Sequence, residues 1–414
     1  VLGLSKILAL LSAAVIARYF DRETSGIVFF VTGIVSLSIS ITTLGLAASS
    51  SYYYSRNLRR GRHARNWQVF HLALLIAILP SAIIAFLALS MEEARDELSM
   101  LIVPILAVSC FMAAIRQISK MFFTIENRRD WSLIHDSVTY NFLIILTIVG
   151  WSFLQGGGQL GAVTGLIAIL IASSLAGAFA IWHTIRMLTA DRGPFEVNRI
   201  PSRRYTIALM AISLPSMVAQ GSALILNKID VLLIGPLAGA VEVGTYSVAI
   251  RMTFLSGVLT EVIALFLAPK IIAIGASGNR NKQWEILKLA TKLQFAALLI
   301  TTIPIIVFHK QIITLIFGAG YIDVSTTYLI MQAGKTLTAI FSPVIALFTA
   351  LGFNREMAKV AVIVAIINVG LNLWLIPLYG ATGAAISGTI ALVIMFGNYI
   401  RLTFEIRRRA RMAK

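Results

Sequence analysis

Charged side chains are scarce in this sequence. Asp, Glu, Lys and Arg make up 13% of its 414 residues, whereas hydrophobic residues make up 58%. Soluble domains carry about 25% charged residues, and even a large soluble domain keeps a sizeable surface in water. The composition therefore excludes an ordinary water-soluble fold and predicts that lipid is the solvent for most of the chain.

Cysteine and catalytic signatures are also missing. The one cysteine, Cys110, lies in an apolar run, which excludes a disulfide or a cysteine-based metal site within the chain. The sequence has no Walker A motif, no G-x-S-x-G and no H-E-x-x-H, which excludes ATP hydrolysis by a P-loop and the matching hydrolase chemistry. His71, His135 and His183 lack metal-ligand spacing, and we interpret them as separate packing or interface groups.

Long apolar runs dominate what is present, each near the roughly 20 residues that a membrane-spanning helix needs. Twelve such runs occur, at residues 1–19, 26–50, 68–90, 100–123, 132–154, 161–185, 205–235, 245–269, 289–308, 325–350, 360–377 and 382–404. The predicted fold class is therefore all-α, integral to the membrane, with twelve transmembrane helices.

Lys and Arg are unevenly divided between the connections that join these runs. Connections 51–67, 124–131, 186–204, 270–288, 351–359 and 405–414 carry 23 of them, and the alternate connections carry 3. Positive residues stay on the cytoplasmic side during insertion. We therefore predict a multi-pass protein of the plasma (inner) membrane with both termini in the cytoplasm. The net charge of +17 then reflects topology rather than a nucleic-acid surface.

The middle of the chain predicts two six-helix halves. The polar connection 186–204 contains two Pro and one Gly, as a linker would. We assign residues 1–190 to an N-terminal lobe, 191–204 to a cytoplasmic linker and 205–414 to a C-terminal lobe. Gly161-Ala-Val-Thr-Gly165 is echoed by Gly380-Ala-Thr-Gly383, and Glu23-Thr-Ser-Gly26 by Glu242-Val-Gly244. Such echoes favour duplication, with the halves related by an axis along the membrane normal.

Ionisable residues inside a membrane are costly and usually face a bundle interior or a water-filled cavity. In the predicted spans the bases include Lys6, Arg18, Arg116, Lys120, Lys228, Arg251, Lys292 and Lys335, and the acids are Asp136, Asp230 and Glu261. Residues near the ends of runs, such as Lys120 and Asp136, can also extend their side chains to the membrane–water interface. Arg116 and Lys120 are four residues apart and share a helix face. An anion should therefore lie opposite them, either an acidic side chain or a substrate phosphate.

Several short stretches carry a family resemblance. They are Ile16-Ala-Arg18-Tyr-Phe20 with Gly26-Ile-Val-Phe-Phe30 and Leu44-Gly-Leu-Ala47, Asp230-Val-Leu-Leu-Ile-Gly235 with Val243-Gly-Thr-Tyr246, Phe317-Gly-Ala-Gly-Tyr321, and Ile376-Pro-Leu-Tyr-Gly380. In this order they resemble the polysaccharide (O-antigen type) flippases of the multidrug/oligosaccharidyl-lipid/polysaccharide exporter superfamily. The resemblance implies two six-helix lobes around a central cavity, alternating access, and a polyprenyl-pyrophosphate-linked oligosaccharide as cargo.

We accordingly predict a flippase, not an enzyme, that moves this cargo from the cytoplasmic to the outer leaflet for cell-surface polysaccharide synthesis. Arg18 and Asp230 match basic and acidic positions of the family, and the other assignments rest on position alone. The predicted pyrophosphate-binding bases are Arg18, Arg116, Lys120, Lys228, Arg251 and Lys335. Asp230 and Glu261 are candidates for coupling to Na⁺ or H⁺, with no other cofactor and no metal. Polar groups expected to line the glycan path are Gln220, Asn227, Gln332 and Asn368.

Other functions stay open at this point. The predicted partners are the lipid-linked saccharide, membrane lipids and a polysaccharide polymerase or ligase of the same pathway, with no nucleic acid. The alternative function is an ion-coupled antiporter that exports cationic drugs or metabolites. Its cavity should be mainly acidic, and the excess of bases over acids in the spans argues against it. A membrane-embedded polymerase or ligase is a third class, but such enzymes tend to carry a large exterior loop, and every connection here is short.

Overall fold

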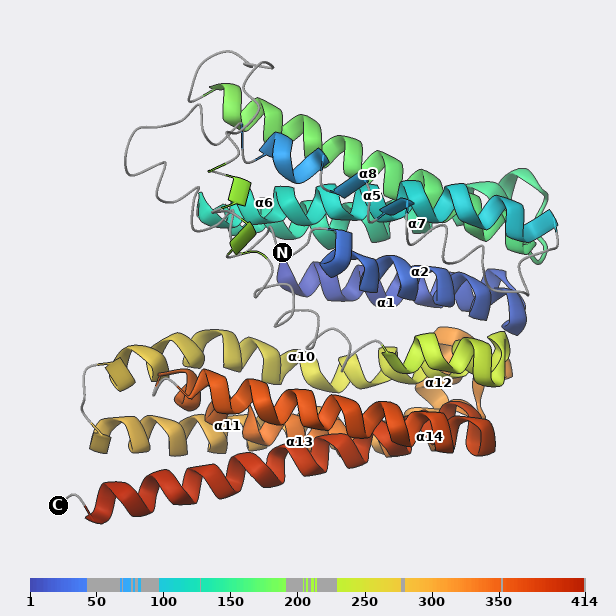
Figure 1. Cartoon of the computed structure of the whole chain (residues 1–414). Coiled ribbons are helices and arrows are strands. Elements are labelled where there is room, and N and C mark those ends of the chain that lie inside the picture. The colour runs from blue at the N-terminus through green and yellow to red at the C-terminus, as the bar shows by residue number, and fades with distance from the viewer. Residues whose placement is uncertain are drawn as a thin grey trace. The chain divides into compact units, whose positions relative to one another are not determined.

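Every regular element in the described part of the chain is helical, as a computed structural model shows (Figure 1). The described residues are 1–42, 68, 70–75, 77–78, 81–82, 97–126, 128–190, 204, 206–207, 210–211, 213, 229–276, 280–350 and 353–412. A helix satisfies its backbone N–H and C=O groups internally, which is what a chain in lipid requires. The all-α integral membrane class is therefore confirmed.

The helices follow the predicted runs closely. In the first half they are α1 (Leu2–Tyr19), α2 (Arg22–Thr42), α5 (Glu97–Ile125), α6 (Arg129–Leu133), the π-helical turn η2 (Ile134–Val138), α7 (Thr139–Leu154) and α8 (Ala162–Ala190). In the second half they are a short helix Ile229–Ala238, α10 (Ala240–Ala276), α11 (Arg280–Val307), α12 (His309–Phe317), the 3-10 turn η3 (Ala319–Tyr321), α13 (Val324–Ala350) and α14 (Asn354–Met412).

Six stretches of the described helices are long and apolar enough to cross a membrane. They are Ile102–Ile125, Asp130–Leu154, Ala162–Thr189, Ala240–Ala268, Trp284–Val307 and Lys359–Thr403, and the last covers two predicted runs. α1, α2 and α13 also coincide with predicted runs. Most of the runs 68–90 and 205–235 lies outside the described residues.

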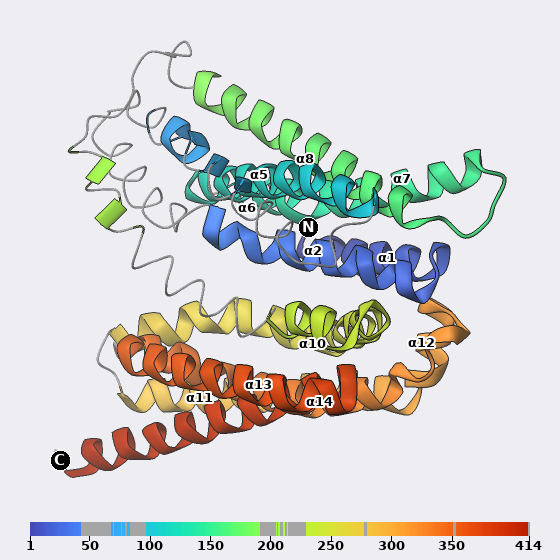
Figure 2. The same ribbon diagram turned by 45° about the vertical axis from the view of Figure 1, so that its right-hand side comes forward.

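Contacts group the chain into two compact units, residues 1–228 and 229–414. The predicted linker lies outside the described residues apart from Arg204, so its role stays a prediction. Within the first unit α5 packs against α2 and α8, and within the second unit α13 packs against α10 and α14. Both views show the long helices of each unit lying side by side (Figure 1, Figure 2). In each half, the helix of the fourth predicted span (α5 or α13) therefore contacts the helices that contain the second and the sixth predicted spans.

Two of the predicted spans are joined almost without a connection. α14 contains one residue with non-helical dihedral angles, Gly380, which separates the eleventh span from the twelfth. Its φ of 56° favours glycine, and an added Cβ would collide with the Glu242 side chain. The Glu242 carboxylate accepts a hydrogen bond from the backbone N–H of Ala381 (2.7 Å). It therefore caps the start of the twelfth span, where a helix dipole favours negative charge.

The fourth and fifth spans of the first unit carry the details that matter for the site. α5 contains Cys110, whose side chain is fully buried. The fifth span is a continuous helical segment in which the π turn η2 connects α6 to α7. Such turns are rare and frequently occur at functional sites.

Candidate functional site

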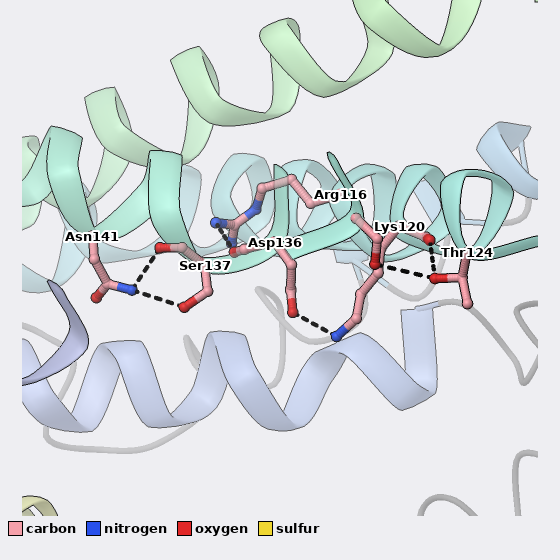
Figure 3. Close-up of polar contacts among 7 residues, drawn as sticks. Arg116, Lys120, Thr124, Asp136, Ser137 and Asn141 are labelled. Carbon is pink, nitrogen blue, oxygen red and sulfur yellow. Dashed lines mark hydrogen bonds and ion pairs between the residues drawn. The ribbon is translucent and has the colours of Figure 1, made fainter. Parts of the chain in front are cut away.

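Two cations of α5 converge on one residue of the π turn (Figure 3). Lys120 Nζ lies 2.6 Å from the carboxylate of Asp136, and Arg116 Nη1 donates to the backbone carbonyl of Asp136 at 3.4 Å. The sequence predicted that an anion would face this pair of bases, either a side chain or a substrate. In this structure Asp136 is that anion for Lys120.

The two bases differ sharply in their surroundings. Arg116 is 5% exposed, its Nε is buried without a hydrogen-bond partner among the described residues, and its guanidinium lies 4.3 Å from the ring centroid of Tyr140. The side chains of Lys120 and Asp136 are 35% and 28% exposed. Arg116 is thus enclosed by protein and retains an unused donor, whereas the ion pair beside it is accessible.

Polar side chains extend on both sides of this pair. Towards the α6 end, the Thr124 and Ser132 hydroxyls lie 3.1 Å apart. Towards α7, Asn141 donates to the carbonyl and hydroxyl of Ser137 at 2.7 and 3.2 Å, as Figure 3 shows. The Oδ1 of Asn141 accepts a hydrogen bond from Ser12 of α1 (2.7 Å). A polar strip therefore joins α1, α5, η2 and α7 inside the first unit.

The histidines predicted to be separate are partly paired. Nε2 of His135 lies 2.9 Å from Nδ1 of His183, and the His135 ring is fully buried against Phe123 and Phe179. The two residues are packing groups, as predicted, but they contact each other instead of standing alone, because η2 and α8 pack together although their sequence positions are far apart. Among the described residues, no group of three or more His, Cys, Asp or Glu side chains could hold a metal ion.

The second unit has its own buried polar cluster around Asp230. Both carboxylate oxygens are used: Tyr246 of α10 donates its hydroxyl to Oδ2, and Asn372 of α14 donates to Oδ1 at 2.7 Å. Asn368 continues the cluster to Ser387 (3.1 Å). Because Asp230 lies in helix Ile229–Ala238, these contacts tie the seventh predicted span to the eighth and eleventh.

A base from a further helix acts on the same carboxylate. The positive charge of Lys335, on α13, interacts favourably with Asp230. On the twelfth span, a Cβ at Gly388 would lie 3.7 Å from Asp230 Oδ2, so that helix also approaches closely. Asp230 and Lys335, to which the sequence analysis gave different roles, are thus near enough for their charges to interact.

Gln332 and Asn368, which we expected along the glycan path, are enclosed by protein. They are 2% and 1% exposed. Gln332 accepts from Ser256 at 2.7 Å, which links α13 to α10, and Thr301 of α11 donates to the Ser256 carbonyl at 2.8 Å. These amides hold helices of the second unit together. Gln220 and Asn227 lie outside the described residues.

The other predicted site residues are scattered. Arg18 is exposed in the last turn of α1, Arg251 is half-buried on α10, and Glu261 is exposed ten residues further along α10. Lys228 lies outside the described residues. The sequence analysis gave no site role to Tyr140 or Asn372, and it named Tyr246 only as part of a family motif. The one available signal was the spacing of Asn368 and Asn372, which places two amides on one helix face.

Comparison with known proteins gives one family match. Residues 1–271 match the model of the family described as polysaccharide biosynthesis protein. The chain is 26% identical over 246 residues to the probable low-salt glycan biosynthesis flippase Agl15 of Haloferax volcanii. That alignment covers 58% of this chain and 50% of that protein, so this chain spans about half the length of the curated relative it matches.

Two solved structures have a similar fold. An inward-facing multidrug resistance MATE family transporter of the MOP superfamily has a TM-score of 0.76 at 17% identity, covering 99% of this chain and 96% of that chain. The lipid II flippase MurJ in an inward closed conformation has a TM-score of 0.73 at 17% identity, covering 97% of this chain and 86% of that chain. At such low identity the likeness establishes the architecture alone.

Proposed function

Because this chain belongs to the polysaccharide biosynthesis protein family, we propose that it is a flippase for a polyprenyl-pyrophosphate-linked oligosaccharide. It moves this lipid from the cytoplasmic to the outer leaflet by alternating access, for cell-surface polysaccharide synthesis. The observation that carries the proposal is the pair of bases on one face of α5, Arg116 and Lys120, one fully enclosed and one accessible. The flippase names of Agl15 and MurJ support it.

The sign of the charge is the physical argument. A pyrophosphate headgroup needs cationic donors, and charge-assisted hydrogen bonds to phosphate are roughly twice as strong as neutral ones. The low dielectric inside a membrane protein strengthens each of them. Arg116 has a buried Nε without a partner, and Lys120 is reachable from outside. The polyprenyl tail stays in the bilayer while these groups hold the head.

Ion coupling is the second part of the proposal. Asp230 is the group on which a coupling Na⁺ or H⁺ acts, and Glu261 is the second candidate. The Asp230 carboxylate is bonded to Tyr246 and Asn372 on two other spans. A change in its charge or ligation would therefore alter how these spans are held together. A ligand that binds one arrangement better than another shifts the population towards it.

The proposed setting follows from the charge of the connections. The protein lies in the plasma (inner) membrane with both termini in the cytoplasm, because 23 Lys and Arg fall on one set of connections and 3 on the other. A polysaccharide polymerase or ligase would act on the same lipid after translocation.

A second function, export of cationic drugs or metabolites by ion-coupled antiport, is favoured by the likeness to a multidrug resistance transporter. Asp230 and Glu261 are the acids that would serve it. A cationic cargo needs a mainly acidic cavity, however, and bases clearly outnumber acids in the predicted spans.

Reconstitution distinguishes the two functions. Purified protein is placed in liposomes that carry a fluorescent polyprenyl-pyrophosphate sugar in both leaflets, and the fraction open to an external quencher is followed. We expect protein-dependent exchange, which Lys292→Gln should preserve because Lys292 is an exposed base on α11 outside the proposed site. No exchange, together with efflux of an organic cation down an imposed ion gradient, would support the antiporter instead.

A further inference from the structure

Both cations of the proposed headgroup site bind the same residue, but through groups of different kinds. Lys120 binds the Asp136 side chain, whereas Arg116 binds the Asp136 backbone carbonyl. We propose that the Asp136 carboxylate is a built-in competitor: it occupies Lys120 while the transporter is empty, and the pyrophosphate headgroup displaces it. This inference rests on the proposed function and assigns a regulatory role within the same site.

The accessibility of the ion pair makes exchange feasible. The side chains of Lys120 and Asp136 are 35% and 28% exposed, so an incoming anion can reach the ammonium group without unpacking the unit. For a partly exposed ion pair, the equilibrium constant between the paired and the separated side chains is only about 1.4 to 5. A doubly charged headgroup can therefore outcompete a single carboxylate that is held this loosely.

Arg116 provides the fixed part of the site. It is 5% exposed, stacks 4.3 Å from the Tyr140 ring centroid, and makes a long hydrogen bond (3.4 Å) to a main-chain carbonyl that no ligand can remove. In the part of the chain that the structure describes, its Nε has no hydrogen-bond partner. Arg116 therefore stays in place while Lys120 changes its partner, and one base positions the head as the other exchanges.

The π turn gives the exchange a structural consequence. Asp136 lies at the centre of η2, between α6 and α7 (Figure 3). Its side chain is one of the links that hold this irregular turn against α5. When the carboxylate is released, the turn loses that link while keeping the link from Arg116. The arrival of cargo is thus transmitted to the fifth span at a point where the helix is already irregular.

The two possible roles of Asp136, structural partner and competitor of the anion, predict opposite effects of its removal on anion binding. If Asp136 only orients Lys120, replacing Asp136 with Asn should weaken binding of an anion. If Asp136 competes for Lys120, the same change should strengthen binding. Without the Asp136 carboxylate, Lys120 is available for the anion in every empty molecule. Because the ion pair is favoured by about 1.4- to 5-fold, its loss should raise the affinity for the anion by about 2- to 6-fold.

The test uses the full-length protein in nanodiscs, with inorganic pyrophosphate as the probe in calorimetric titration. Asp136→Asn and Asp136→Ser are compared with the wild type, and Asp130→Asn is the matched control. Asp130 is an exposed acid in the first turn of α6, so its removal makes the same change in net charge. We expect both Asp136 variants to bind 2- to 6-fold more tightly than Asp130→Asn. In the Lys120→Gln background, Asp136→Asn should add no gain.

Flipping of the fluorescent lipid is measured in parallel. If wild-type protein moves the lipid but neither Asp136 variant binds pyrophosphate more tightly than the control, the inference is overturned and the proposed function stands. If Asp136→Asn still tightens pyrophosphate binding in the Lys120→Gln background, the inference is also overturned. The carboxylate would then repel the anion directly, without competing for Lys120. If the wild type neither moves the lipid nor binds pyrophosphate, the proposed function fails and the inference fails with it.

Discussion

Replacing Asp230 with Ala is expected to lower the free energy of unfolding by about 2–3 kcal/mol. The carboxylate accepts hydrogen bonds from Tyr246 and Asn372, and all three side chains are at most 5% exposed. A buried donor that loses its partner costs about 1–3 kcal/mol, although comparable bonds between membrane helices average only about 0.6 kcal/mol. For two donors these limits correspond to about 1.2 and about 6 kcal/mol, and the expected loss lies between them.

The assay is reversible denaturation in detergent micelles, followed by the loss of helical circular dichroism. Asp230→Asn keeps the shape and one acceptor, and should cost about half as much as Asp230→Ala. The control is Thr389→Val, which removes one side-chain bond to the Ile330 carbonyl (3.0 Å) and should cost well under 1 kcal/mol. If Asp230→Ala is no more destabilising than Thr389→Val, the cluster does not hold its helices together and the reasoning is refuted.

Two further predictions concern transport and packing. Arg116→Ala and Lys335→Ala should each lower lipid flipping at least several-fold while membrane insertion stays intact; full activity in both variants and in the double variant would remove these residues from the site. Gly165→Ala should lower the midpoint of thermal unfolding by a few degrees, because its Cβ would meet Val28 Cγ2 at 2.5 Å. Gly150→Ala meets nothing within 4 Å and should be neutral or stabilising. Equal effects at the two glycines would contradict the close packing of α8 on α2.

The helical architecture could be predicted because lipid imposes simple rules. A run of apolar residues must form a helix when neither water nor a neighbouring strand can satisfy its backbone. The predicted all-α class, integral to the membrane, is confirmed, and the family resemblance is confirmed by the match over residues 1–271. The helix α12, which lies in what we predicted to be a connection, was missed because its nine residues are too few to span a membrane.

The partners in the polar clusters could not be predicted, because they depend on which faces of distant helices meet. The stacking of Arg116 and Lys120 required an anion, but Glu126, Asp130 and Asp136 all follow within a short stretch of chain. The π turn adds a residue to the helical register and so decides which acid faces α5. Asp230 and Asn372 are 142 positions apart, and no local pattern indicates that they bond.

The burial of Cys110 makes the native chain a convenient host for spectroscopic labels. Its thiol is shielded inside α5, so reagents that modify cysteine should pass over it in the folded protein. Pairs of cysteines introduced at exposed positions, such as Phe153 and Leu315, can then be spin-labelled without first removing the native one. Distances recorded with and without cargo would follow the two halves of the molecule through a transport cycle.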